Sequence, residues 1–202
     1  MSNIFETSLE QSIKVKKTLL DYQYIGEMEK IGNIIVQSII SGNKLMICGN
    51  GGSAADAQHL VAELIVRLRP EINRSPIPAL SLALDTSSIT ACGNDFGFDF
   101  LFERNILALG KKGDVLICLS TSGESKNIEL AAIAAKSIGV VTFGMLGNTG
   151  GIVKKVCDYS IVIPSNDTAR IQECYMTLGH ALMGFIEDKL LENSFIKKNS
   201  TY

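Results

Sequence analysis

Residues 45–63 read LMICGNGGSAADAQHLVAE, an apolar run that ends at three glycines and leads into a helix-forming segment. The apolar run predicts a buried strand, the glycines permit a tight turn, and Ser53 is placed to cap the following helix. A turn of this kind presents free backbone N–H groups to an anion. His59 and Glu63 lie four residues apart, which puts an imidazole and a carboxylate on one helix face. The stretch therefore predicts an anion site with chemically active groups beside it.

The segments that follow predict an α/β domain built on a parallel sheet. Apolar runs separated by helix-length segments predict five strands, at residues 44–48, 79–84, 114–119, 140–145 and 159–163. Helices are expected at residues 53–68, 98–109, 127–137 and 168–191, with a short one ending near residue 91. This alternation favours right-handed βαβ units, and hence three layers: a five-stranded parallel sheet with helices on both faces. Ligands of such folds bind outside the carboxyl ends of the strands.

An N-terminal helix extension precedes the first strand. Residues 5–41 lack proline, and apolar residues recur at helical spacing at Met28, Ile31, Ile35 and Ile39, so we expect one long helix or two with a bend near Gly26. Such an extension has no place inside a complete α/β unit, which favours packing against another subunit. The expected organisation is a helical oligomerisation segment at 1–42, the α/β domain at 43–192 and a polar, frayed tail at 193–202.

The amino-acid composition argues against nucleic-acid and membrane partners. The formal net charge is -2 and the chain has no long basic run, which argues against nucleic-acid binding. The five cysteines include no CxxC pair and favour core thiols in a reducing cytoplasm. The N-terminal residues are polar, and no segment is apolar for the length of a membrane span, so a cytoplasmic protein with a small polar or anionic ligand is expected.

The turn after the third predicted strand is the clearest anion site. Four hydroxyls surround Gly123 at the start of a helix, from Ser120, Thr121, Ser122 and Ser125. Capping the helix needs one hydroxyl, whereas four of them beside free N–H groups are typical of a phosphate site. We expect a phosphate to bind there without a lysine.

The first turn also fits the dinucleotide fingerprint, with Gly49, Gly51 and Ala54 at its three small positions. A nucleotide-binding unit needs an acidic residue about 20 positions later, at the end of its second strand. Here the second strand ends only at Asp85, and the His59/Glu63 pair serves no purpose in cofactor binding. These features disfavour the dehydrogenase interpretation.

The chain has two histidines, His59 and His180, and each alone is compatible with a structural role. His180 shares the last helix with Gln172, so that two imidazoles, the Glu63 carboxylate and an amide are available as ligands of a zinc-type ion. Gln172 and His180 are eight residues apart, about 12 Å along a helix, so both reach one ion only if it lies between them. Spacing alone leaves the metal open.

Two further features have ordinary explanations. Arg67 follows Glu63 by four residues and is placed to form an ion pair with it or to contact a substrate. Asn94 and Asp95 are expected in a loop, where they also fit plain turn chemistry.

Four motifs together resemble a known family, the sedoheptulose-7-phosphate isomerases (phosphoheptose isomerases) of the sugar-isomerase (SIS) domain superfamily. They are the segments at 48–59, 93–98, 120–123 and 167–173, the last followed by His180. The similarity runs in order from about residue 30 to residue 190 and implies a flavodoxin-like SIS fold. It also implies a cytoplasmic homotetramer, with active sites between subunits, that converts sedoheptulose 7-phosphate into D-glycero-D-manno-heptose 7-phosphate for lipopolysaccharide or capsule heptoses.

The resemblance also implies site residues. Substrate contacts carry over onto Asn50, Gly51, Gly52, Ser53, Asn94, Asp95, Ser120, Thr121, Ser122 and Ser125, and Glu63, Arg67 and Gln172 are included with them. One Zn²⁺ per site is implied, with His59, Glu63, Gln172 and His180 as ligands. Val66, Phe96 and the segment 145–147 depart from the family pattern, which leaves the exact heptose and its pathway open.

An aldose-ketose isomerase moves a proton between adjacent carbons, and our hypothesis assigns this acid and base work to Glu63 and His180. The main alternative is a non-catalytic SIS-domain adaptor that binds a protein partner such as a replication initiator. A phosphosugar-sensing module is a third interpretation, although no DNA-binding segment is attached. Retention of both Glu63 and His180 favours the enzyme.

Overall fold

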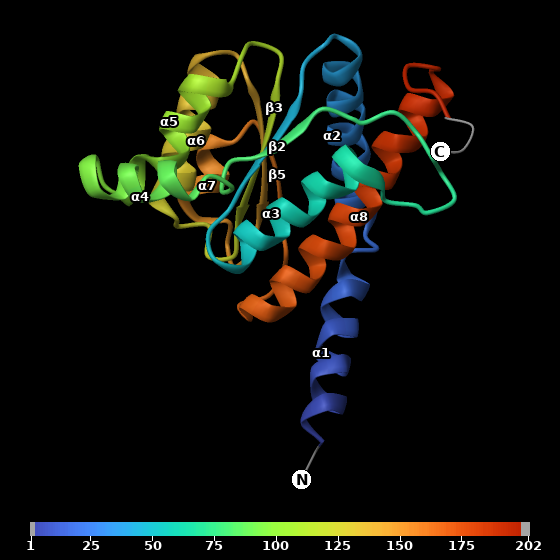
Figure 1. The fold of residues 1–202 in the computed structure, drawn as a ribbon. Coiled ribbons are helices and arrows are strands. Elements are labelled where there is room, and N and C mark those ends of the chain that lie inside the picture. Colours follow the sequence, from blue (N-terminus) through green and yellow to red (C-terminus); the bar gives the residue numbers. More distant parts are fainter. Residues whose placement is uncertain (1–2, 199–202) are drawn as a thin grey trace.

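A wholly parallel sheet in the order β2-β1-β3-β4-β5 organises the computed structural model, which describes residues 3–198 (Figure 1). The strands are β1 (Leu45–Cys48), β2 (Ala79–Ser81), β3 (Val115–Ser120), β4 (Val141–Leu146) and β5 (Tyr159–Val162). The predicted fold class is confirmed, and the central position of β1 and β3 places the glycine and serine turns next to each other.

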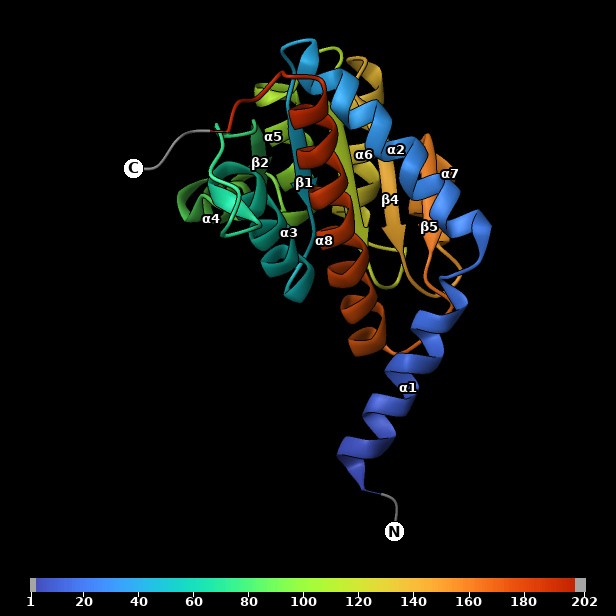
Figure 2. The same ribbon diagram turned by 90° about the vertical axis from the view of Figure 1, so that its right-hand side faces the viewer.

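Helices cover both faces of the sheet (Figures 1 and 2). One layer contains α2 (Tyr22–Ile40), α3 (Gly52–Ala62) and α8 (Thr168–Glu192), and the other contains α4 (Thr86–Asp95), α5 (Leu101–Leu109), α6 (Lys126–Ser137) and α7 (Gly151–Val156). Side chains alternate between the layers along each strand, so Leu45 and Ile47 join the first core while Met46 and Cys48 join the second. All four are buried because neither face of the sheet meets water.

The N-terminal extension consists of two helices, α1 (Ile4–Thr18) and α2. The helical segment is interrupted at residues 19–21. There the Asp21 side chain accepts a hydrogen bond from the Gln23 N–H and caps α2. The bend expected near Gly26 is therefore wrong, because this residue lies inside α2. No residue of α1 is buried, and the helix projects from the body of the molecule (Figure 2).

Helix α3 begins differently from the prediction. Gly51, with φ of 53°, occupies the N-cap position without a side-chain cap, and Ser53 is buried within the first turn instead of capping it. At its other end α3 continues into a π-helical turn, η1 (Glu63–Arg67). The helix expected over 53–68 thus changes its hydrogen-bonding pattern at Glu63.

Other differences lie at element ends. Strand β2 is three residues long, and α4, capped by Asp85, runs to Asp95, so Asn94 and Asp95 lie in a helix and not in a loop. A 3-10 turn, η2 (Phe98–Phe100), precedes α5, and the short α7 was not expected. None of the helices within residues 3–198 is long and apolar enough to cross a membrane.

The segment after α8 is packed and not frayed over its described part. Ile196 is buried in the core, and the Ser75 N–H donates to the Lys197 carbonyl. Arg74 and Lys198 form an isolated antiparallel bridge. An apolar side chain and backbone pairing thus hold residues 193–198, whereas the last four predicted tail residues, 199–202, lie outside the described part.

Candidate active site

The glycine turn after β1 is closely fitted to its surroundings. A Cβ at Gly52 would overlap with the side-chain amide of Gln172 on α8, so a larger residue there requires this amide to move. Asn50, in the same turn, exchanges two amide hydrogen bonds with Asn127, at 2.8 and 2.9 Å. The turn is therefore hydrogen-bonded to the start of α6 and packs closely against Gln172 of α8.

Asn127 is a site residue that sequence reasoning missed. It lies in the first turn of α6 and is only 2% exposed, and its amide joins the glycine turn to the serine turn that ends β3. Its position just after the serine turn was visible in the sequence. Its contact with the glycine turn also depends on the pairing of β1 with β3. Only the sheet order shows that these two turns touch.

The serine turn has a defined internal geometry. The buried Ser120 accepts a hydrogen bond from the Gly123 N–H at 3.1 Å, and its Oγ lies 3.1 Å from Ser125 Oγ. Ser122 Oγ accepts from the Glu124 N–H at 3.1 Å. Ser125 occupies the N-cap position of α6 but makes no side-chain capping bond, so its hydroxyl is not used as the helix cap. This geometry favours a ligand site over simple capping.

Two titratable groups lie near these turns. Burial raises the pKa of the Asp56 carboxyl, while the nearby His59 opposes the shift, and one Asp56 oxygen is buried without a partner among residues 3–198. Burial also raises the pKa of the Tyr175 hydroxyl, which keeps this core side chain neutral. Burial thus disfavours the charged form of both groups.

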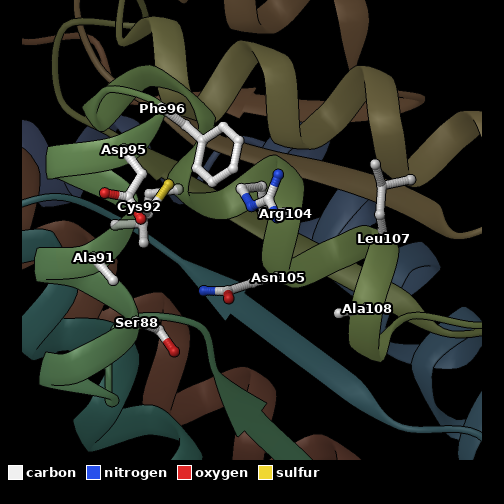
Figure 3. A pocket seen from close by; sticks show the side chains of 10 residues that line it. Ser88, Ala91, Cys92, Asp95, Phe96, Arg104, Asn105, Leu107 and Ala108 are labelled. Carbon is white, nitrogen blue, oxygen red and sulfur yellow. The ribbon is translucent and has the colours of Figure 1, made fainter.

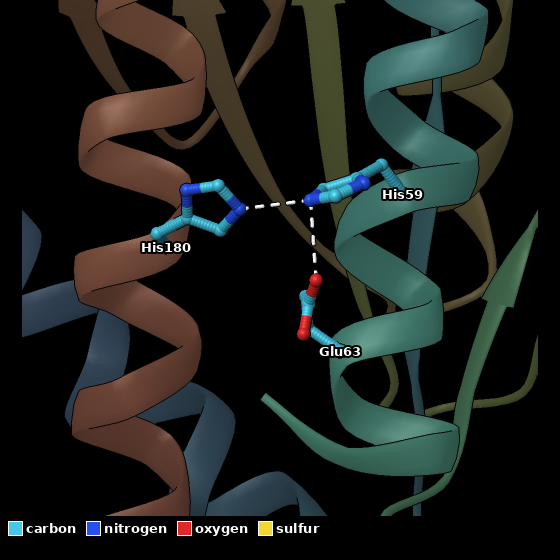
Figure 4. A group of neighbouring side chains, drawn as sticks. All are labelled: His59, Glu63 and His180. Carbon is cyan, nitrogen blue, oxygen red and sulfur yellow. Dashed lines mark hydrogen bonds and ion pairs between the residues drawn. The ribbon is translucent and has the colours of Figure 1, made fainter. Parts of the chain in front are cut away.

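The chemically active side chains meet between α3 and α8 (Figure 4). His59 Nε2 lies 2.8 Å from His180 Nε2 and 3.1 Å from Glu63 Oε1. The side chain of His59 is 50% exposed and that of Glu63 is 16% exposed, so the group is open on one side and sheltered on the other. The predicted pairing of Glu63 and His180 at one site agrees with this geometry.

This arrangement fits a divalent cation. His59 Nε2 faces both a carboxylate oxygen and a second imidazole nitrogen, and the single proton it can carry satisfies only one of these contacts well. The three ligand atoms lie within 4.8 Å of one another. Two imidazoles and a carboxylate are the donor set of many catalytic zinc sites. His59, Glu63 and His180 thus form a group able to hold a metal ion.

Gln172 lies at the other end of the helix pair. Gly52 faces Gln172 and Leu60 faces Gly179, so α3 and α8 run in the same direction side by side. Gln172 is two turns from His180, about 12 Å along α8. Its amide packs at the glycine turn, and its role as a metal ligand stays a prediction.

Arg67, Asn94 and Asp95, three further predicted site residues, are exposed. Arg67 makes no ion pair among residues 3–198, and Glu63 faces His59 instead, so the expected pairing of Arg67 with Glu63 is absent. Asn94 donates to Asp95 at 2.7 Å on the surface end of α4. Their roles as substrate contacts stay predictions.

A separate cavity of about 530 Å³ lies between α4 and α5 (Figure 3). Arg104 and Phe96 both line this cavity, and the Arg104 guanidinium lies 3.9 Å from the centre of the Phe96 ring. Of the predicted site residues, only Asp95 lines this cavity. It is therefore distinct from the site between α3 and α8.

Comparison with known proteins identifies the family of the chain. The chain matches the SIS domain family model over residues 11–147. The phosphoheptose isomerase of Clostridium acetobutylicum is 44% identical over 191 residues, which are 94% of this chain and 96% of that protein. The chain belongs to the phosphoheptose isomerase family. The predicted family resemblance is confirmed.

Solved structures of the family share the fold. Phosphoheptose isomerase GmhA from Neisseria gonorrhoeae superposes with a TM-score of 0.79 at 35% identity, covering 91% of this chain and 95% of that one. A phosphoheptose isomerase from Francisella tularensis gives 0.86 at 30% identity, covering 91% and 96%. The five-stranded SIS architecture of this chain is thus that of the phosphoheptose isomerases.

Proposed function

We propose that the chain is an aldose-ketose isomerase that converts sedoheptulose 7-phosphate into D-glycero-D-manno-heptose 7-phosphate, a precursor of surface heptoses. The observation that carries the proposal is the convergence of Glu63, His59 and His180 on the helix pair that starts at the glycine turn. Membership of the phosphoheptose isomerase family identifies the substrate class. We place the reaction in the cytoplasm, as the family resemblance implies.

The dimensions of the site suit a long phosphosugar. His59 lies seven residues beyond Gly52, about 10 Å along α3, so the anion-binding turns and the acid-base group are separated along one helix. An extended seven-carbon sugar phosphate spans such a separation. The phosphate is held at the serine turn, and C1 and C2 lie beside Glu63. This anchoring supplies orientation to the reacting end.

The reaction needs a base for the proton on one carbon and an acid for the neighbouring oxygen. Glu63, sheltered from water and without an arginine or lysine partner among residues 3–198, takes the proton from C1 of the ketose and returns it to C2 of the enediol. His180 exchanges a proton with the oxygens on these carbons, and His59 orients the Glu63 carboxylate through its contact at 3.1 Å. One proton thus moves from C1 to C2 and another between the two oxygens, so the isomerisation needs no oxidant or reductant.

We further propose that His59, Glu63 and His180 bind one Zn²⁺ per site, with Gln172 as the fourth ligand. The short distances among the first three residues support the set. Bound zinc supplies Lewis-acid polarisation of the substrate carbonyl. Because Gln172 packs at the glycine turn, its participation requires its side chain to turn toward His180 or a contribution from another subunit.

Conversion of sedoheptulose 7-phosphate, followed by NMR, tests the isomerase and the metal together. We expect the aldose product with untreated protein, its loss after treatment with a chelator, and its recovery with added Zn²⁺. Conversion that is insensitive to the chelator would contradict the metal and leave the isomerase standing. No product under any of these conditions would contradict the isomerase itself and favour a binding role.

We also propose a homotetramer with active sites between subunits. Support comes from α1, which buries none of its residues and carries a stripe of exposed apolar side chains at Phe5, Leu9 and Ile13. These residues are four apart, so they share one helix face. A large apolar stripe on a projecting helix is typical of a subunit contact.

The double variant Phe5→Glu/Leu9→Glu should reduce the assembly to smaller species, because it places two charges on the apolar stripe. Light scattering coupled to size-exclusion chromatography measures the mass. The matched control, Glu6→Gln/Glu10→Gln, changes the neighbouring exposed face of α1 and should keep the wild-type mass. A wild-type protein that elutes as a monomer at all concentrations refutes the tetramer.

A further inference from the structure

Glu63 stands at the first position of the π-helical turn η1. Such turns depart from the i→i−4 hydrogen-bond pattern of the α-helix and occur mostly as single turns at functional sites. A single π turn in an α-helix needs support, because its carbonyl groups are displaced from their usual partners. The groups that bind the carbonyls of η1 therefore help to determine where the Glu63 carboxylate lies.

Arg74 supplies that support from the loop after η1. Its NH2 group donates to the Glu63 carbonyl and its NH1 group to the Leu64 carbonyl, both at 2.7 Å. NH1 also donates to the Ser75 carbonyl at 3.1 Å. The Arg74 side chain is 0% exposed, so its guanidinium is shielded from water. A planar guanidinium thus holds the first two carbonyls of η1 in a fixed relation.

The same guanidinium is tied to the helix that carries His180. Arg74 Nε donates to Glu187 Oε1 at 2.7 Å, and the Glu187 side chain is 1% exposed. Glu187 lies seven residues after His180 on α8, which puts the two side chains on the same face two turns apart. Arg74 therefore connects the backbone of Glu63 to α8 through hydrogen bonds from a buried guanidinium.

We propose that Arg74 is a positioning residue that fixes η1 against α8 and thereby holds the Glu63 carboxylate beside His59 and His180. Arg69 also contacts Glu187, at 2.7 Å from its Nε, but makes none of the carbonyl bonds to η1. The two arginines thus share one carboxylate and differ in their contact with the turn. The catalytic consequence rests on the proposed isomerase function, whereas the support of η1 does not.

The variant Arg74→Lys separates charge from geometry. Lysine keeps a positive charge beside Glu187, but its single ammonium cannot reproduce the fork that reaches two carbonyls and a carboxylate. Arg69→Lys is the matched control, because it makes the same chemical change at the other arginine of Glu187. Hydrogen exchange of the η1 amides, read by mass spectrometry, reports the support of the turn without any substrate.

We expect exchange at residues 63–68 to accelerate about tenfold or more in Arg74→Lys, while residues 53–58 of α3 keep the wild-type rate. We also expect kcat to fall about 100-fold, with KM within about threefold of wild type, because the phosphate end stays anchored. Arg69→Lys should leave both readouts close to wild type. Wild-type exchange in Arg74→Lys, or equal losses in the two variants, overturns the proposal.

A second variant, Glu187→Gln, covers the case in which Arg74→Lys does not fold. It keeps an oxygen for Arg74 Nε and leaves both carbonyl bonds in place, so it should lower the melting temperature and preserve the exchange rate of η1. If hydrogen exchange at residues 63–68 of Glu187→Gln accelerates as much as in the rest of the chain, the two carbonyl bonds do not support η1, and the proposal is contradicted. A wild-type protein without isomerase activity refutes the proposed function, and the exchange data still decide the role of Arg74.

Discussion

Replacing Glu63 with glutamine is expected to lower kcat by about 10³-fold, because a neutral amide cannot take a proton from the substrate carbon. The two side chains have nearly the same shape, and the amide can still contact His59 Nε2, which lies 3.1 Å from the carboxylate. The fold and the phosphate-binding turns should therefore be unchanged. Steady-state kinetics give kcat and KM, and the melting temperature reports the fold.

Glu71→Gln is the control for this substitution. Glu71 is exposed in the loop after η1. Its substitution removes the same charge as Glu63→Gln, but outside the site. We expect wild-type kinetics for it. A Glu63→Gln enzyme that keeps most of its turnover would remove Glu63 from the chemistry and leave His180 as the remaining candidate for the base.

Gly123→Ala should raise KM by about tenfold or more and lower the free energy of unfolding. Gly123 has φ of 73°, and a Cβ there would overlap with the backbone of Gly150, which cannot move aside as a flexible side chain would. Overpacking of this kind costs about 1–3 kcal/mol. The serine turn must shift to relieve it, and its hydroxyl and N–H groups then lose their alignment. Urea unfolding and the kinetics of the same preparation measure the two effects.

Gly42→Ala is the matched control for backbone strain. Gly42 has a similar φ of 80° but no atom within 4 Å of the position of a Cβ. Its substitution should cost only the left-handed backbone term, about 1 kcal/mol, and leave KM unchanged. Equal kinetic effects of the two alanines would show that the serine turn tolerates displacement and does not hold the substrate.

The sheet and the closeness of His59 to Glu63 were predictable because their signals are local. Each apolar run between polar turns indicated a strand buried on both faces, and the spacing of His59 and Glu63 placed both on one side of α3. His59 and His180 are 121 positions apart, so the ligand chemistry of the side chains and the family resemblance suggested their pairing, while spacing alone left it open. The structure brings these three residues together within one chain.

The parts that were missed depend on tertiary contacts. Asn127 becomes a site residue only because β1 and β3 are neighbours, and Arg74 lies in a segment whose sequence indicates a plain loop. The π turn at Glu63 has no sequence pattern that distinguishes it from an α-helix. The helix break at Asp21 had a local signal, its capping side chain, but the long apolar periodicity concealed it.

Three helices begin at the edge of the sheet where we propose that the phosphate binds: α3 and α6 follow β1 and β3, and α8 meets the glycine turn through Gln172. The basic side chains in the first turns of α6 and α8 are already paired, Lys126 with Glu129 and Arg170 with Glu173. We therefore expect helix dipoles, which neither titrate nor carry net charge, to contribute to the attraction for the phosphate. As the pH changes, we expect binding of this end of the substrate to follow the ionisation of the phosphate, together with that of Asp56 near the turns.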